Sequence, residues 1–174
     1  MNLPKTHQGL NAPLLTLCLL LGGCLHPYTV KLNDNVLFTP SAALRNAVTQ
    51  DPGLQACLDR ALERDKQTDP ATITLLACPG AGVQTLAGIE ALENLEQLEL
   101  SDNTIENLSP LSFLKDLRVL GLRNNRVGDI RPLEQLPILR FLSLEGNERI
   151  PCRQLDAFVA RLGNTFGRPQ ACID

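Results

Sequence analysis

Residues 73–158 read, in register, ITLLACPGAGVQTLAGIEALEN (73–94), LEQLELSDNTIENLSPLSFLKD (95–116), LRVLGLRNNRVGDIRPLEQLPI (117–138) and LRFLSLEGNERIPCRQLDAF (139–158). Leucines and asparagines recur with a period of 22 residues. The recurring sets are Leu98, Leu120 and Leu142; Leu100, Leu122 and Leu144; and Asn103, Asn125 and Asn147. A fixed period of this length indicates a solenoid, in which each repeat packs only against its neighbours.

The core of each segment follows the pattern L-x-x-L-x-L-x-x-N, which resembles the leucine-rich repeat. After the asparagine, the pattern I-x-x-L-x-P/G-L/I-x-x-L resembles the 22-residue, internalin-like class of these repeats. The resemblance covers residues 51–174 and is most specific in the two central repeats. It implies a short α/β solenoid of about four repeats, with parallel strands on its concave face, that binds a protein partner.

Each L-x-L segment predicts a short strand whose leucine side chains point inward, because alternate side chains of a strand point to opposite faces. The turn after each strand buries polar backbone groups that need hydrogen-bond partners. We expect the amides of Asn103, Asn125 and Asn147 to bond these groups in one repeat after another, as a structural ladder.

A helix is predicted at each end, because an uncovered solenoid end leaves apolar side chains in water. Asp51-Pro52 is typical of a helix start. An apolar stripe follows at Leu54, Cys57, Leu58, Ala61 and Leu62, with Gln55, Asp59, Arg60 and Glu63 on the opposite face. A second stripe, ended by Gly163, consists of Leu155, Phe158, Val159 and Leu162, and residues 164–174 are expected to form a tail. The predicted boundaries are 51–72 for the N-terminal cap, 73–150 for the repeats and 151–174 for the C-terminal cap.

The N-terminus predicts export. An apolar run from Leu14 to Leu21 follows Lys5, and it is too short to span a bilayer, so residues 1–23 are interpreted as a signal peptide. Leu21-Gly22-Gly23-Cys24 resembles a bacterial lipobox, which implies cleavage before Cys24, lipidation of that residue and attachment to the membrane. The alternative is an ordinary secretory signal. In bacterial lipoproteins, Leu rather than Asp at position 25 favours the outer membrane, facing the periplasm.

Residues 24–50 are expected to be a lead-in between the lipid anchor and the repeats. Two short apolar segments, 29–32 and 35–38, flank Asn33-Asp34 and predict a hairpin. The alternative is a flexible linker. Whether residues 25–50 cover the concave face is left open by the sequence.

Four cysteines remain after removal of the signal peptide, and an exported chain meets an oxidising compartment. They allow three pairings. Cys57 lies on the first cap stripe and Cys78 on the strand beneath it, while Cys152 begins the last cap and Cys172 ends the tail. We therefore expect Cys57–Cys78 and Cys152–Cys172 disulfide bonds, the alternative being four reduced core thiols. A zinc site is not expected, because the chain has no C-x-x-C spacing.

Catalysis, cofactor binding and nucleic-acid binding are not expected. His7 is lost with the signal peptide and His26 lies two residues from Cys24, so no Ser-His or Cys-His arrangement can form in the repeats. The 16 basic and 19 acidic residues are interleaved, and the net charge is −3, without the basic stripe of nucleic-acid-binding proteins.

The outward strand positions form three columns. They are Leu75, Gln97, Val119 and Phe141; Ala77, Glu99, Gly121 and Ser143; and Pro79, Ser101, Arg123 and Glu145. An apolar stripe with a polar rim is what protein recognition needs. We therefore expect an unknown protein partner to contact Leu75, Gln97, Glu99, Val119, Arg123, Phe141 and Glu145 of a monomeric chain. The alternatives are a structural or assembly role in the envelope, and surface adhesion.

Overall fold

The computed structural model describes residues 30–32, 35–38 and 48–172. The predicted signal peptide and Cys24, the predicted lipidation site, lie outside these residues. The chain falls into two compact units, residues 1–41 and 42–174, which are described separately. In the first unit, β1 (Val30–Leu32) pairs antiparallel with β2 (Asn35–Phe38), as expected for the hairpin. Within the described ranges, no helix is both long enough and apolar enough to cross a bilayer.

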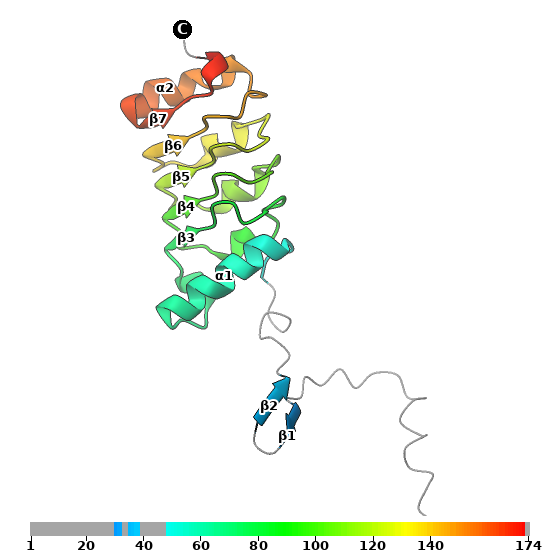
Figure 1. The fold of residues 1–174 in the computed structure, drawn as a ribbon. Coiled ribbons are helices and arrows are strands. Elements are labelled where there is room, and N and C mark those ends of the chain that lie inside the picture. Colours follow the sequence, from blue (N-terminus) through cyan, green and yellow to red (C-terminus); the bar gives the residue numbers. More distant parts are fainter. Residues whose placement is uncertain (1–29, 33–34, 39–47, 173–174) are drawn as a thin grey trace, which may run out of the picture. The chain divides into compact units, whose positions relative to one another are not determined.

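The second unit is a leucine-rich repeat solenoid built on one parallel sheet, whose strands lie in chain order (Figure 1). Its strands are β3 (Leu75–Ala77), β4 (Gln97–Glu99), β5 (Val119–Gly121), β6 (Phe141–Ser143) and β7 (Phe166–Gly167). The register aligns Leu75, Gln97, Val119 and Phe141, as the 22-residue period predicts. The sequence pattern and the hydrogen-bonded register therefore agree over all four predicted strands.

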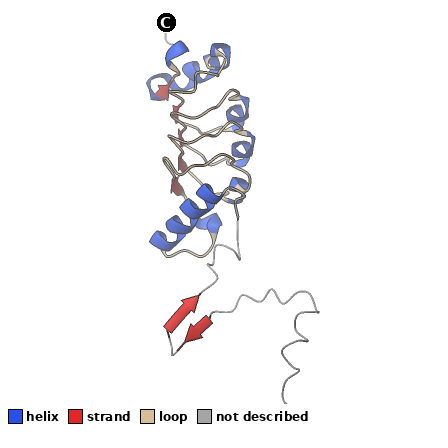
Figure 2. Ribbon diagram, turned by 45° about the vertical axis from the view of Figure 1, so that its right-hand side comes forward, coloured by secondary structure: helices blue, strands red, loops and turns tan. Residues whose placement is uncertain are grey.

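Short helical turns carry the chain back on the convex side, opposite the strands (Figure 2). One 3-10 turn follows each of the strands β3 to β6, namely η3 (Ile89–Ala91), η4 (Ser109–Phe113), η5 (Arg131–Gln135) and η6 (Cys152–Gln154). Three more lie near the ends, η2 (Pro70–Thr72), η7 (Gly163–Thr165) and η8 (Gln170–Cys172). Pro110 and Pro132 lie in the first turns of η4 and η5, where a missing N–H costs no helical hydrogen bond.

A fifth strand, β7, lies where the sequence predicted only a tail. Phe166 pairs with Leu142 of β6 and takes the inward position that leucine holds in the other strands. It comes 24 residues after Leu142 rather than 22, because the helix α2 (Asp156–Leu162) is inserted before it. The strand was not predicted because it departs from the 22-residue spacing and has phenylalanine where the pattern has leucine.

The asparagine ladder joins each repeat to the one before it. Each side-chain oxygen accepts a hydrogen bond from a backbone N–H of the preceding repeat, and each side-chain nitrogen donates to a carbonyl there. The N–H donors are Val83 to Asn103 at 2.9 Å, Ile105 to Asn125 at 3.0 Å and Val127 to Asn147 at 3.1 Å. The carbonyl acceptors are those of Cys78, Leu100 and Leu122, at 2.9, 2.9 and 2.8 Å. All three asparagines are buried, so the ladder satisfies backbone groups that water does not reach.

The residue directly before each ladder position has a left-handed backbone conformation. The φ angles are +59° at Gly80, +61° at Asp102, +52° at Asn124 and +78° at Gly146. Glycine, asparagine and aspartate adopt this conformation most readily. At these positions the turn that presents the ladder amide therefore restricts the choice of residue.

The N-terminal cap is the helix α1 (Pro52–Asp65), which is fastened to the first repeat by Asp51. One carboxylate oxygen of Asp51 accepts hydrogen bonds from the backbone N–H groups of Gly53 and Leu54, at 2.9 and 3.0 Å. The other oxygen accepts from the N–H groups of Gln84 and Thr85 in the first repeat, at 2.8 and 3.1 Å. Asp51 therefore caps the helix and bonds the repeat at the same time.

Gln55 does not lie on a solvent-facing side of α1, where the sequence placed it. Its buried side chain accepts hydrogen bonds from the backbone N–H groups of Val48 and Thr49, both at 2.9 Å. Its amide nitrogen donates to Asp59 at 2.8 Å. The residues that precede the helix cover this face, which helical periodicity alone does not reveal.

The C-terminal cap, α2, buries Leu155, Phe158 and Leu162, but Val159 is 39% exposed, contrary to the predicted stripe. The helix has seven residues, and its Phe158 packs against Phe166 of β7 with the ring centres 6.0 Å apart. The contact with β7 turns positions 155, 158 and 162 toward the core, which leaves Val159 outside.

Both predicted disulfide bonds are present. Cys57 on α1 is joined to Cys78, and Cys152 is joined to Cys172, with Cα–Cα distances of 5.8 and 5.4 Å. The alternative of four reduced thiols is wrong in this structure. Each bond closes a loop of about 20 residues, which stabilises the fold by about 3 kcal/mol in the chain-entropy account.

We expect Asn125→Ala to lower the free energy of unfolding by roughly 2–4 kcal/mol, because several buried backbone groups lose their partners. Urea unfolding followed by circular dichroism measures the change. The control is Asn164→Ala, an exposed asparagine outside the ladder, which should shift stability by less than about 0.5 kcal/mol. Equal losses in both variants would contradict a supporting role for the ladder.

Asp51 should make stability pH-dependent. Burial by itself raises the pKa of Asp51, but the four backbone N–H donors outweigh it and lower the pKa below the usual 3.8. A carboxyl group whose pKa is lower in the folded state stabilises the fold above its unfolded-state pKa, and this contribution is lost as the pH falls through the folded-state pKa.

We therefore expect Asp51→Ala to lose about 1–3 kcal/mol near neutral pH and progressively less below about pH 4. Urea unfolding at a series of pH values measures this difference. Asp116→Ala is the matched control, since Asp116 is exposed and forms no side-chain hydrogen bond within the described residues. A loss at Asp51 that stays constant down to pH 2 would rule out the proposed charge contribution.

Candidate functional site

The first outward column of the sheet is apolar and open to solvent. Leu75 and Phe141 are 40% and 43% exposed, Gln97 is exposed, and Val119 is half-buried. The parallel register places these four side chains side by side across β3 to β6. The side chains are anchored on strands whose other face is the leucine core, so the column is held by a rigid support.

The second column consists mainly of small residues, and Glu99 is its one long side chain. A methyl group at Gly121 would collide with the carboxylate of Glu99, so this carboxylate lies directly over the glycine. One of its oxygens also accepts a hydrogen bond from the backbone N–H of Ser101 at 2.7 Å. Glu99 is thus folded down onto the sheet and is not a projecting rim charge.

Glu145, in the third column, is folded down in the same manner. Its carboxylate lies over Gly167 of β7 and accepts a hydrogen bond from the hydroxyl group of Ser143. Arg123, by contrast, is exposed and takes part in no ion pair among the described residues. The seven predicted contact residues therefore share one face, but two carboxylates form its floor.

Two further charged positions, just before the starts of β5 and β6, were missed by the sequence reasoning. Arg118 and Arg140 each directly precede a first-column residue, and both are exposed. Arg118 forms an ion pair with Glu96 at 3.7 Å. The sequence could have indicated these positions, because arginine occurs one residue before the first column in two successive repeats.

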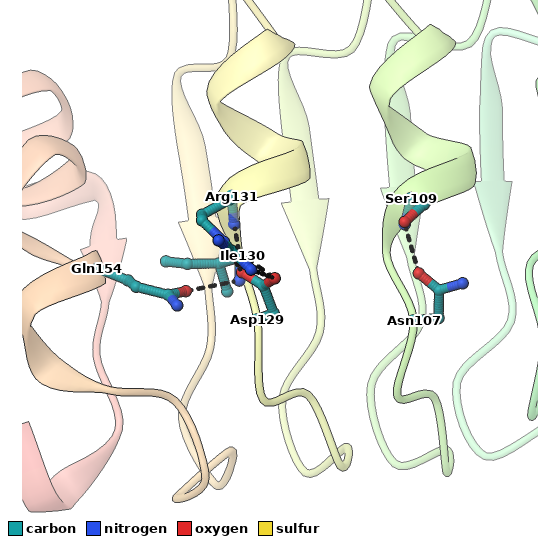
Figure 3. A network of polar contacts seen from close by, with 6 residues as sticks. All are labelled: Asn107, Ser109, Asp129, Ile130, Arg131 and Gln154. Carbon is teal, nitrogen blue, oxygen red and sulfur yellow. Dashed lines mark hydrogen bonds and ion pairs between the residues drawn. The ribbon is translucent and has the colours of Figure 1, made fainter.

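The convex side carries a polar network that supports the turns (Figure 3). Asn107 and Asp129 hold equivalent positions, and they accept hydrogen bonds from the backbone N–H groups of Ser109 at 2.9 Å and Arg131 at 3.1 Å. Hydrogen bonds from the Arg131 side chain and backbone lower the pKa of Asp129 to about 2. Gln154 accepts from the backbone N–H of Ile130 at 2.9 Å. Asn107 and Asp129 bond the first backbone N–H groups of η4 and η5, and Gln154 joins the start of η5 to the last repeat, so their polar atoms serve the fold.

A hollow of about 370 Å³ lies beside the N-terminal disulfide bond, and it offers little reactive chemistry. Its lining includes Cys57, Cys78, Arg60 and Arg64. Both sulfur atoms are bonded to each other, and Arg64 is paired with Asp65 at 2.7 Å. The concave face is therefore the strongest candidate surface of the described residues.

Comparisons with known proteins agree with the fold. A family model described as leucine-rich repeats, in two copies, matches residues 93–134. Comparison with curated proteins finds no match. Among solved structures, an internalin (InlF) of Listeria monocytogenes is 36% identical with a TM-score of 0.53, over 58% of this chain and 32% of that one. Internalin C2 of the same organism is 25% identical with a TM-score of 0.51, over 60% of this chain and 54% of that one.

The fold class predicted from the sequence is thus confirmed. The central residues are leucine-rich repeats, and the parallel sheet with its convex turns has the solenoid fold of these internalins. The matched part of this chain spans about a third and about half of the two internalins' lengths. The likeness therefore concerns the repeat domain.

Proposed function

We propose that this chain is a non-catalytic protein-binding module that recognises a protein partner through the concave face of its repeats. The observation that carries the proposal is the apolar column of exposed Leu75 and Phe141 and half-buried Val119, with Arg123, which forms no ion pair among the described residues, beyond it. Exposed aromatic anchors and arginines dominate the binding energy of most protein interfaces. Solenoids of this kind offer their concave surface for binding.

The size of the face limits the partner contact. Each of the first four strands has three residues, so the outward surface is a small, shallow sheet. A standard interface buries about 800 Å² on each partner. A single segment or loop of the partner therefore suits this face better than a broad, flat surface.

We further propose that the chain is a lipoprotein of the bacterial cell envelope, held by a lipid on Cys24 in the outer membrane and facing the periplasm. Two disulfide bonds support export to an oxidising compartment, because such bonds rarely persist in the cytosol. The LGGC sequence at residues 21–24 supplies the lipidation site.

We expect Cys24→Ala to remove the chain from the membrane fraction and to abolish the added mass of the acyl chains. Membrane fractionation, detergent phase partitioning and intact-mass measurement provide the readouts. Cys18→Ala serves as the control, since Cys18 lies within the predicted signal peptide and should leave both properties unchanged. An unmodified chain that enters the soluble exported fraction with Cys24 intact would instead support an ordinary secretory signal.

We expect the double variant Phe141→Ala with Arg123→Ala to lose its protein partner while its urea midpoint stays unchanged. Crosslinking in native envelopes followed by mass spectrometry measures the loss. The matched control replaces Phe113, which is 67% exposed at the end of η4, and Arg153, which is exposed on η6. An identical crosslink pattern in both variants would contradict recognition through the concave face and favour a structural role in the envelope.

A further inference from the structure

We infer that the partner segment recognised by this face is extended, with an apolar side chain between acidic residues. The inference rests on the proposed recognition function and adds the chemistry of the partner. Two observations support the inference. The carboxylates are bonded within the chain whereas two arginines are not, and the apolar column lies between these arginines.

From one residue before the first column to the third column, the strands carry three glutamates and three arginines, but these are not equally available. Glu99 and Glu145 lie flat over glycines and accept hydrogen bonds from Ser101 and Ser143. The third glutamate is Glu96, which is half-buried and paired with Arg118 at 3.7 Å. All three carboxylates are thus engaged within the chain.

Arg123 and Arg140 are exposed, and no described carboxylate lies within ion-pair distance of either guanidinium group. A planar guanidinium group binds a carboxylate through two parallel hydrogen bonds, and this geometry gives both strength and specificity. An incoming acidic side chain therefore finds two unpaired cations. An incoming basic side chain meets these cations and must compete with the hydrogen bonds that the floor carboxylates already accept.

The arginines stand on opposite sides of the apolar column. Arg140 directly precedes Phe141, whereas Arg123 follows Val119 by four residues on the neighbouring strand. The distance along the strand direction from the level of Arg118 and Arg140 to the level of Arg123 corresponds to five residues, or at most about 17 Å. An extended partner segment of about six residues covers this distance. An apolar side chain nearer the Arg140 end of this segment then contacts Phe141 and Val119, while the carboxylates on either side of it reach the two arginines.

The test is selection of random peptides, displayed on phage, against the full chain. We expect enriched peptides to carry Asp or Glu on both sides of an apolar residue. Synthetic versions of these peptides should bind the double variant Arg123→Glu, Arg140→Glu more weakly, by on the order of tenfold or more for each arginine. The matched control Arg153→Glu reverses an exposed charge on the C-terminal cap and should leave binding unchanged.

Urea midpoints of all variants verify folding, and Arg123→Gln with Arg140→Gln replaces the charge-reversal pair if that pair is destabilised. One contrary result is that the enriched peptides are basic or uncharged, bind the Arg123→Glu, Arg140→Glu variant as well as the wild type, and still need Phe141 for binding. This result would overturn the inference that the partner segment is acidic, but not the proposed concave-face function. Enriched peptides whose binding does not change in Phe141→Ala would contradict the proposed concave-face function itself. The two failures are therefore distinguishable.

Discussion

Buried side-chain amides hold this solenoid in register. Each ladder asparagine accepts a hydrogen bond from one repeat and donates to carbonyl groups of two, so neighbouring turns cannot slide past each other without breaking several bonds. The leucine core supplies most of the driving force for folding, but leucines alone tolerate small shifts. The ladder aligns the strands, and the aligned strands place the outward side chains in columns. The arrangement of the proposed binding surface therefore depends on the buried hydrogen bonds of the asparagine ladder.

The ends of the array need substitutes for these bonds. Ala81 stands where the first repeat would have its asparagine, and the carboxylate of Asp51 bonds that repeat from the capping helix instead. At the other end, Glu148 accepts hydrogen bonds from the backbone N–H groups of Gln170 and Ala171. A disulfide bond reinforces each of these closures. At both ends, backbone N–H groups that have no ladder asparagine are bonded by a carboxylate, and a disulfide bond closes the same end.

The sequence predicted those features that follow from strict periodicity. Strand register, the ladder, both caps and the cysteine pairs are local consequences of a 22-residue pattern or of its interruption. Features that depend on contacts outside the repeat pattern were not predicted. Phe166 forms a strand after a changed spacing, Gln55 is buried by the residues before its helix, and Glu99 lies flat because its neighbour at position 121 has no side chain. On the concave face, outward positions were therefore predictable, but the conformation of the charges was not.

The left-handed residue before each ladder asparagine has a further consequence for how such a domain can change in length. Its position repeats every 22 residues. The side chain of one such residue, Asn124, donates a hydrogen bond to another, Asp102, and each ladder amide bonds backbone groups of the preceding repeat. An insertion or deletion that is not a whole repeat would shift the register, so that a residue which disfavours positive φ occupies the left-handed position. It would also leave a ladder amide without its hydrogen-bond partners. Whole-repeat duplication, by contrast, reproduces every contact and adds one level to each outward column, about 4.8 Å of new surface. Within the ladder the array can thus grow only in complete units, whereas the last strand, which is not followed by a ladder asparagine, joins the sheet after 24 residues.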